Sequence, residues 1–217
     1  MLDPLSVFAP LPLKERWFVR ARAFSAPLAE VAARAPPGKI ADVGCGHGLL
    51  TAHLALGRAD RFLYGVDPDP RKIDWARRGP GALPNVELLV GRVEDLSPRL
   101  DASLDAVVVC DVLYLLPLDA WAGFFAAVRR LLRPGGALLL KEAEADGSWK
   151  ERKCLLQEQV MVRVLGKTRG SGALHLKPRE VTRQLLREQG FSVDELVPLG
   201  KGYSTPHLLF VAHVLKN

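Results

Sequence analysis

The sequence predicts an α/β fold in which helices cover both faces of a doubly wound, mostly parallel sheet. Apolar segments of strand length alternate with helical patterns along most of the 217 residues, which is typical of such sheets. Residues 40–55, IADVGCGHGLLTAHLA, read as a strand end, a glycine-rich turn and the start of a helix. The run Val107–Val109 is what a strand buried on both faces looks like.

Composition and charge bound the class of protein. Hydrophobic residues make up 48% and charged residues 25% of the sequence. It contains no run of about eighteen apolar residues, so we expect no membrane-spanning helix. Three scattered cysteines are too few for a disulfide framework or a zinc cluster, and the first residues lack a secretion signal. We therefore expect a cytoplasmic protein with no metal site. The net charge of +6 favours an anionic partner, such as nucleic acid, an acidic membrane surface or a phosphorylated substrate, or reflects no partner at all.

The N-terminal residues predict a lead-in and a helix. Residues 1–13 contain three prolines and read as an extended segment. A helical pattern follows over residues 14–34, with a break near Pro27 and with Trp17, Phe18, Phe24 and Leu28 as candidate buried positions.

The remaining elements follow from runs of apolar residues and from turn signals. Pro70 suits the first turn of a helix, Asp119 is the expected cap of another, and Gly190 ends a third. The predicted strands are residues 39–43, 61–66, 86–90, 104–110, 137–141, 191–197 and 207–214, and the predicted helices are 49–56, 70–78, 119–132 and 178–189.

The glycine-rich turn indicates a nucleotide-type ligand. Gly44, Gly46 and Gly48 supply positive φ and close backbone approach, and the helix start presents unpaired N–H groups. The dinucleotide fingerprint places its third glycine three residues after the second. Here the third glycine comes after two, and Leu49 stands where that fingerprint requires Gly or Ala.

Preceded by Asp42, the run DVGCGHG resembles motif I of class I S-adenosylmethionine-dependent methyltransferases. YGVDPDP, VELLVGRVEDL, LDAVVVCDVLYLL, LLRPGGALLLKE and LLREQGFSV are similar to successive segments of that family. The resemblance covers residues 38–145 well and the C-terminal part loosely. It implies S-adenosylmethionine as cofactor and a seven-stranded sheet whose last strand is antiparallel.

The resemblance also implies one methyltransferase domain over residues 1–217. Its four parts are an N-terminal helical lead-in over 1–37, a cofactor-binding core over 38–145, a helical cap insertion over 146–177, and a last helix with a strand hairpin over 178–217. In this family the N-terminal helix often covers the cofactor pocket.

The family pattern assigns cofactor contacts to positions near the strand ends. Asp67 is expected to accept the ribose hydroxyls, and Asp42 to hold the loop or the amino group of the cofactor. Arg92 stands where the family more often has Asp, so backbone groups of Val93, or else Glu94 or Asp95, are expected to contact the adenine, with Arg92 as a candidate to stack on it. Asp111 is a candidate to face the sulfonium or the acceptor. The predicted cofactor-binding residues are Asp42, Gly44, Cys45, Gly46, Gly48, Asp67, Arg92, Val93, Glu94 and Cys110.

A general base is needed only when the acceptor must lose a proton to attack, as a hydroxyl does. His207 is the first candidate because an antiparallel last strand places its hairpin on the ligand side of the sheet, and His175 is the second. Tyr114 and Tyr203 are candidates to orient the acceptor.

The segment 146–177 interrupts the alternation of strands and helices. Between Trp149 and Gly170, six basic residues face two acidic ones. It is interpreted as a substrate lid with a basic rim, as a helix on an anionic membrane surface, or as an ordinary packed helix with a solvated basic face.

We therefore predict a methyltransferase that acts on a small-molecule or lipid-like acceptor, possibly anionic, at oxygen rather than nitrogen. CDVLY stands where an N-P-P-Y signature would indicate amino-group methylation of nucleobases, which lowers the case for nucleic acid. The alternatives are an RNA or protein methyltransferase that uses the basic cap, a nicotinamide-dependent oxidoreductase, and a non-catalytic domain that retains the cofactor.

Overall fold

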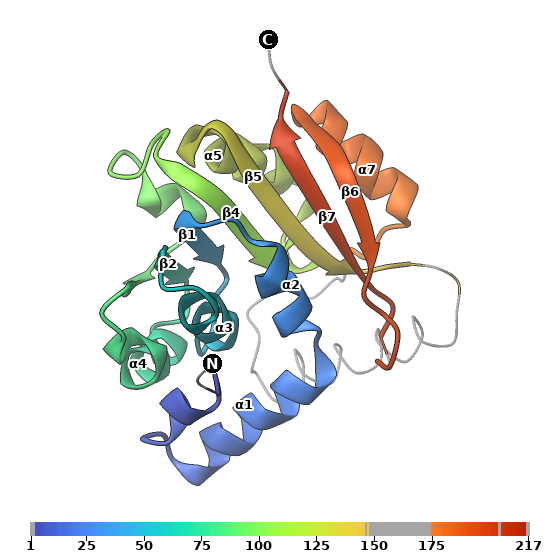
Figure 1. Cartoon of the computed structure of the whole chain (residues 1–217). Helices are drawn as coiled ribbons and strands as arrows, with labels where there is room; N and C mark the ends of the chain where they lie inside the picture. The colour runs from blue at the N-terminus through green and yellow to red at the C-terminus, as the bar shows by residue number, and fades with distance from the viewer. Residues whose placement is uncertain (1–2, 146, 148–174, 204, 216–217) are drawn as a thin grey trace.

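The computed structural model describes residues 3–145, 147, 175–203 and 205–215, which form one seven-stranded sheet in the order β3-β2-β1-β4-β5-β7-β6 (Figure 1). β1 to β5 are parallel, and β7 runs antiparallel to both β5 and β6. The predicted fold class is confirmed. The strands are β1 (Gly38–Val43), β2 (Arg61–Asp67), β3 (Val86–Val90), β4 (Leu104–Cys110), β5 (Leu132–Ala143), β6 (Phe191–Pro198) and β7 (His207–Val214).

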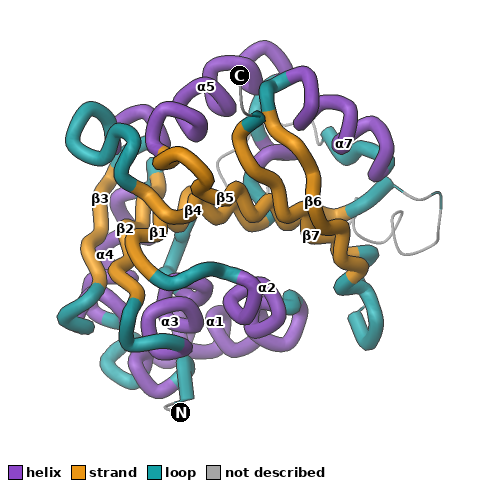
Figure 2. Tube along the Cα trace, turned by 45° about the horizontal axis from the view of Figure 1, so that its top comes forward, coloured by secondary structure: helices purple, strands orange, loops and turns teal. Residues whose placement is uncertain are grey.

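Helices cover both faces of the sheet (Figure 2). α5 and α7 lie on one face, and α1, α2 and α3 lie on the other. The helices are α1 (Leu13–Ser25), α2 (Leu28–Arg34), α3 (Leu49–Gly57), α4 (Pro70–Arg78), α5 (Trp121–Leu131) and α7 (Arg179–Glu188). Short 3-10 turns span Ser6–Phe8, Pro80–Ala82, Val93–Leu96, Leu113–Leu115 and Leu118–Ala120.

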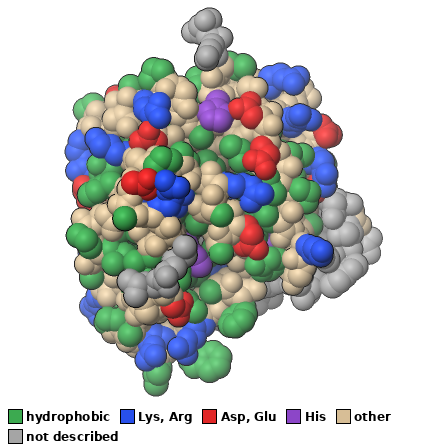
Figure 3. All heavy atoms as spheres, in the orientation of Figure 1, with side chains coloured by type: hydrophobic (Ala, Val, Ile, Leu, Met, Phe, Trp, Pro, Cys, Tyr) green, Lys and Arg blue, Asp and Glu red, His purple; other side chains and the backbone are tan. Residues whose placement is uncertain are grey.

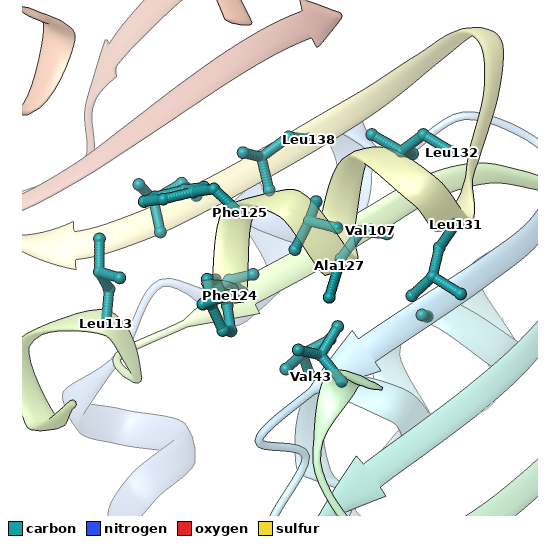
Figure 4. Close-up of a cluster of buried hydrophobic side chains, with 14 of the residues drawn as sticks. Val43, Val107, Leu113, Phe124, Phe125, Ala127, Leu131, Leu132 and Leu138 are labelled. Carbon is teal, nitrogen blue, oxygen red and sulfur yellow. The ribbon is translucent and has the colours of Figure 1, made fainter. Parts of the chain in front are cut away.

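Each face of the sheet has its own hydrophobic core. On the α5 face, Phe124, Phe125 and Leu131 pack against Val107 and Leu138 of the central strands (Figure 4). On the other face, side chains of β1, β2 and β4 pack against α2 and α3. Burial on both faces explains why the central strands read as continuous apolar runs.

The strand register brings distant residues to the carboxyl edge of the sheet. Cys110, the last residue of β4, lies beside Lys141 of β5. Because β7 is antiparallel, its first residue, His207, lies beside Ala143, the last residue of β5. Ligands of open α/β sheets bind outside the carboxyl ends of the strands, so this edge is where a site is expected.

The N-terminal region differs from the prediction in two ways. The lead-in contains a 3-10 turn whose Phe8 is buried, so it is not simply extended. Trp17 and Phe24 were expected to be buried, but they are 71% and 84% exposed. Leu28 is buried as predicted, and the helical pattern breaks at Pro27 between α1 and α2.

Two element ends also differ. Asp119 does not cap α5, which begins at Trp121 after a 3-10 turn and has no side-chain cap. β5 is longer than predicted, since it begins at Leu132, directly after α5.

Most of the predicted cap lies outside the described residues, since residues 146 and 148–174 are not described. The three interpretations of that segment therefore stay predictions. Among the described helices, none combines the length and the apolar character needed to cross a membrane.

Candidate functional site at the carboxyl edge of the sheet

The glycine-rich turn has the geometry that its sequence predicts. Gly44, Gly46 and Gly48 all have positive φ, at 74°, 56° and 80°. A Cβ on Gly44 would collide with Val112, and one on Gly48 would lie 2.5 Å from Cγ of Pro80. These two glycines therefore allow close packing of the turn against its neighbours. Around Gly46 the nearest atoms would lie 3.9 Å away, which leaves its backbone approachable.

Asp42 fastens the turn from inside the protein. It is buried at the end of β1, where its Oδ2 accepts a 2.6 Å hydrogen bond from the Thr51 hydroxyl of α3. Burial raises the pKa of Asp42 to about 6, with the hydrogen bond from Thr51 opposing the rise and the charge of Asp67 adding to it. Asp42 thus ties the end of β1 to α3 across the glycine turn, and the two roles predicted for it stay predictions.

Asp67 faces the same turn from the end of β2. One carboxylate oxygen accepts the amide of Gly46 at 3.0 Å, and the other accepts the amide of Asp69 at 2.9 Å. Its carbonyl accepts the amide of Gly91 at 3.1 Å, which draws the segment after β3 alongside. The acid predicted to bind the ribose therefore lies against the backbone of the glycine turn.

Cys45 and the three residues after Gly91 complete this part of the edge. Cys45 is buried with its sulfur near Gly65, and burial raises the pKa of its thiol well above the usual range. Val93 is buried, whereas Arg92 and Glu94 are exposed. The structure thus places all the predicted cofactor residues except Cys110 around the ends of β1, β2 and β3.

A buried charge cluster lies at the ends of β4 and β5. Asp111 follows Cys110 with a positive φ of 58°, an uncommon conformation for a residue other than glycine. The ammonium of Lys141, which has no exposed surface, donates to both Asp111 oxygens at 2.6 and 2.7 Å. Arg22 of α1 pairs with the same carboxylate.

These charges set the ionisation of the cluster. Burial alone would raise the pKa of Asp111, but Lys141 and Arg22 outweigh it and hold that pKa well below its usual range. Burial raises the pKa of the Cys110 thiol to about 12, and the charge of Asp111 adds to the rise. The thiol of Cys110 is therefore neutral near pH 7.

Glu142 organises the loop that follows β4. Its carboxyl oxygens accept the amides of Val112, Leu113 and Tyr114 at 3.1, 3.0 and 3.2 Å. Burial, and next the charge of Asp111, raise the pKa of Glu142 to about 8 against the opposing effect of these three amides. Glu142 thereby fixes the loop that carries Asp111 and Tyr114.

His207 is buried beside this cluster with one ring nitrogen unpaired among the described residues. Its Nε2 lies 3.1 Å from the carbonyl oxygen of Ser25 in α1, while its Nδ1 has no hydrogen-bond partner there. A carbonyl only accepts, so Nε2 carries the proton and Nδ1 carries a lone pair. Burial first, and then Lys141, lower the pKa of His207 to about 4, so the ring is neutral near pH 7.

Of the other candidates for the acceptor side, Tyr203 lies beside His207, whereas His175 lies beside Tyr114. The ring of Tyr203 meets that of His207 edge-on at 5.5 Å. The amide of His175 donates to the carbonyl of Tyr114 at 2.9 Å, and its ring meets that of Trp121 at 6.5 Å. His207 and Tyr203 are therefore together, whereas His175 lies near the loop after β4.

Helix α1 lies along the edge from the end of β1 to the start of β7. Glu15 lies 3.0 Å from the ring of His47, which is inside the glycine turn, and Phe18 packs against the same ring at 4.9 Å. Further along the helix are the pairing of Arg22 with Asp111 and the contact of Ser25 with His207. One helix thus touches the turn after β1, the end of β4 and the start of β7.

Sequence reasoning missed Arg22, Lys141 and Glu142 as members of the site. The signal available was the pair Lys141–Glu142, two charged residues at the end of an apolar strand pattern. Charged residues are almost never fully buried unless they are paired. Nothing local marks Arg22, whose partner is 89 residues away.

The fold and this edge define a class I, Rossmann-like methyltransferase domain. The profile of a family described as a methyltransferase domain matches residues 41–140. A ribosomal RNA small subunit methyltransferase G of Leifsonia xyli is 33% identical over 156 residues, which are 67% of each chain. The chain belongs to the family of class I S-adenosylmethionine-dependent methyltransferases, and its cofactor is S-adenosylmethionine.

Two other relatives match different shares of this chain and of their own length. A ubiquinone biosynthesis O-methyltransferase of Thiobacillus denitrificans is 29% identical over 93% of this chain and 84% of its own. An uncharacterized 37.1 kDa protein in a Streptomyces fradiae transposon is 33% identical over 76% of this chain. The chain spans only 47% of the length of that protein.

Solved structures share the fold. A 1,6-didemethyltoxoflavin-N1-methyltransferase of Burkholderia thailandensis, with its substrate and S-adenosylhomocysteine, matches with a TM-score of 0.68 at 18% identity. It covers all of this chain and 92% of that one. A DhpI–S-adenosylhomocysteine complex matches with a TM-score of 0.67 at 22% identity over 99% of this chain and 96% of that one.

Proposed function

We propose that this chain transfers the methyl group of S-adenosylmethionine to a hydroxyl oxygen of a small-molecule or lipid-like acceptor. The observation that carries this proposal is the imidazole of His207, which is neutral, buried and oriented, with an unpaired lone pair on Nδ1 among the described residues. A hydroxyl needs a hydrogen-bond acceptor of this kind. Relatives named as O-methyltransferases support oxygen as the acceptor atom.

The residues of the glycine turn fit the cofactor. The carboxylate of Asp67 lies against the open backbone at Gly46, and each of its oxygens accepts one backbone amide, which leaves a lone pair on each oxygen for a ribose hydroxyl. In the proposal, Gly44, Gly46 and Gly48 line the methionine and ribose portion, Asp67 accepts the ribose hydroxyls, and Asp42 holds the loop. Val93 and Glu94 contact the adenine, and Arg92 stacks on it. When bound, S-adenosylmethionine supplies a methyl group already activated on a sulfonium.

The other residues align the acceptor and receive its proton. The hydroxyl donates to Nδ1 of His207, and its proton passes to that nitrogen as the oxygen–carbon bond forms. The carbonyl of Ser25 keeps the ring in the required tautomer. The negative charge of Asp111 stabilises the positive charge that the ring gains. With a pKa of about 4, His207 is a weak base, so it orients the hydroxyl first and takes its proton only as the oxygen–carbon bond forms.

The test uses paired acceptors and paired variants. Methyl transfer from radiolabelled S-adenosylmethionine is measured on long-chain alkyl phenols and on the matched anilines. We expect transfer to phenols and a fall in kcat of at least about 100-fold in His207→Gln, whose amide nitrogen can still reach the carbonyl of Ser25. The affinity for S-adenosylhomocysteine is expected to stay within about threefold.

Transfer to anilines alone, or a His207→Gln enzyme with unchanged kcat, contradicts the proposal. His175→Gln tests the second candidate base in the same assay. Because His175 lies by Tyr114 and Trp121, we expect a smaller effect than at position 207.

A second candidate function is methylation of RNA. The relative from Leifsonia xyli is a ribosomal RNA methyltransferase, and this chain carries a net charge of +6. Filter binding to RNA with a steep salt dependence would favour this candidate, whereas binding that is weak and independent of sequence and structure of the RNA would leave only non-specific charge attraction.

A further inference from the structure

The outward face of α1 carries the three most exposed large hydrophobic side chains among the described residues. Leu13 and Trp17 are each 71% exposed, and Phe24 is 84% exposed. Each residue of an α-helix advances by about 100° around the axis, which places these three within an arc of about 40°. They therefore form one stripe, here called the α1 stripe. Grouped exposed apolar side chains mark an interaction surface, unlike single ones.

Basic residues border the α1 stripe on both sides. By the same geometry, Arg20 and Arg16 lie on one side of it, and Lys14 lies on the other, each within about 60° of a stripe residue. None of the three forms an ion pair among the described residues. The helix's acidic residue, Glu15, is turned inward to His47. The outward face is therefore apolar in the centre and positive at its edges.

The inward face of α1 is occupied, so the stripe cannot turn into the protein. Val19 is fully buried, Phe18 packs on His47, and Arg22 pairs with Asp111. Figure 3 shows hydrophobic side chains projecting beside Lys and Arg side chains at the lower end of the molecule, where Figure 1 places α1.

We propose that α1 docks on an anionic lipid surface through the α1 stripe. Leu13, Trp17 and Phe24 enter the boundary between headgroups and acyl chains, and the bordering basic residues face the headgroup phosphates. Trp, Phe and Leu on one side with Lys and Arg around them are the composition of helices that lie in a membrane interface. Three side chains of one helix offer less area than the roughly 800 Å² that each partner gives to a standard protein interface.

The position of α1 gives this docking a consequence for the site. The same helix touches the glycine turn and His207 from its inward side, so docking would bring the carboxyl edge close to the lipid. The inference does not depend on which atom is methylated, and the experiment below requires no acceptor.

The experiment is sedimentation of the full chain with vesicles, in low and high salt. The vesicles are pure phosphatidylcholine or phosphatidylcholine with about one third phosphatidylglycerol. We expect binding at least about tenfold tighter to the anionic vesicles, and weaker in high salt. Trp17→Ala/Phe24→Ala and, separately, Lys14→Glu/Arg20→Glu are each expected to weaken it at least about tenfold.

Leu118→Ala/Val181→Ala is the matched control, because it removes two half-exposed apolar side chains from other elements. It should bind vesicles as the unsubstituted chain does. All variants should retain affinity for S-adenosylhomocysteine, which shows that they fold. Vesicle binding that survives both α1 double variants overturns the proposal. A second outcome also overturns it: the chain does not bind vesicles, and analytical ultracentrifugation shows a dimer that Trp17→Ala/Phe24→Ala dissociates.

Discussion

Gly46 and Gly48 share a left-handed backbone, but the space around them differs. A Cβ at position 48 would lie 2.5 Å from Pro80, whereas at position 46 its nearest neighbour would be Cδ of Lys72 at 3.9 Å. Gly48→Ala therefore adds overpacking to backbone strain, and we expect it to lower the free energy of unfolding by about 2–4 kcal/mol. Gly46→Ala should cost only about 1–2 kcal/mol. Urea unfolding of both variants measures the difference, and equal losses would contradict it.

Asp67 is expected to contribute more to cofactor affinity than any exposed acid. Losing a hydrogen bond to a charged group costs about 1.5–3 kcal/mol. Asp67→Ala should therefore weaken S-adenosylhomocysteine binding at least about tenfold, as measured by calorimetry. Asp74→Ala is the control, since Asp74 lies exposed on α4. A change within about threefold in Asp67→Ala would refute the ribose assignment.

At the scale of elements, α1 is held to the carboxyl edge by polar contacts made from its inward face. Arg22→Met removes the pairing with Asp111 while keeping much of the side-chain volume. We expect faster amide hydrogen exchange over residues 13–25, because the helix opens locally more often. Arg20→Met, on the exposed side of the same helix, should leave the exchange unchanged. Equal exchange in both variants would show that the pairing does not hold the helix.

The elements that sequence predicted best are those whose signals are local. Residues 70–78, 86–90, 104–110 and 207–214 match the observed bounds, because a first-turn proline, turn residues and apolar runs mark their ends. The side chains that α1 buries differ from the prediction, because its contacts with the rest of the protein invert the usual pattern. It turns Glu15 and Arg22 toward the protein and Trp17 and Phe24 toward solvent.

The same distinction applies to the site. The glycine turn and Asp67 are neighbours along one strand–turn–helix–strand unit, so spacing predicts them. Lys141 meets Asp111 across 30 residues, and Arg22 does so across 89. Such contacts depend on the order of the strands and on the position of the helix, and the spacing of residues along the sequence does not determine either.

At the scale of the whole molecule, His207 makes stability depend on pH. Its pKa is about 4 in the folded protein against 6.5 in the unfolded chain, so the unfolded chain binds more protons between these values. Stability due to this residue is complete above pH 6.5 and is lost as pH falls toward 4. At pH 5 the loss is about 2 kcal/mol.

Glu142 opposes this effect. Its pKa of about 8, against 4.5, favours the folded state as pH falls from 8 to 4.5. The measurement is therefore the difference between the unsubstituted chain and His207→Gln in urea unfolding at pH 7.5 and 5. We expect the variant to lose less stability on acidification. A parallel loss in both chains would contradict the shifted pKa of His207.

The contact between the carbonyl of Ser25 and His207 joins two segments that lie 182 residues apart. It follows that the position of α1, rather than the identity of residue 25, sets the orientation of the imidazole. A chimaera that imports this helix from a homologue still offers a main-chain carbonyl, but the helix must also supply the side-chain partners of His47 and Asp111 to dock in the same place. Recombination at Pro27 should therefore succeed only when the grafted helix carries Glu and Arg at the positions of Glu15 and Arg22.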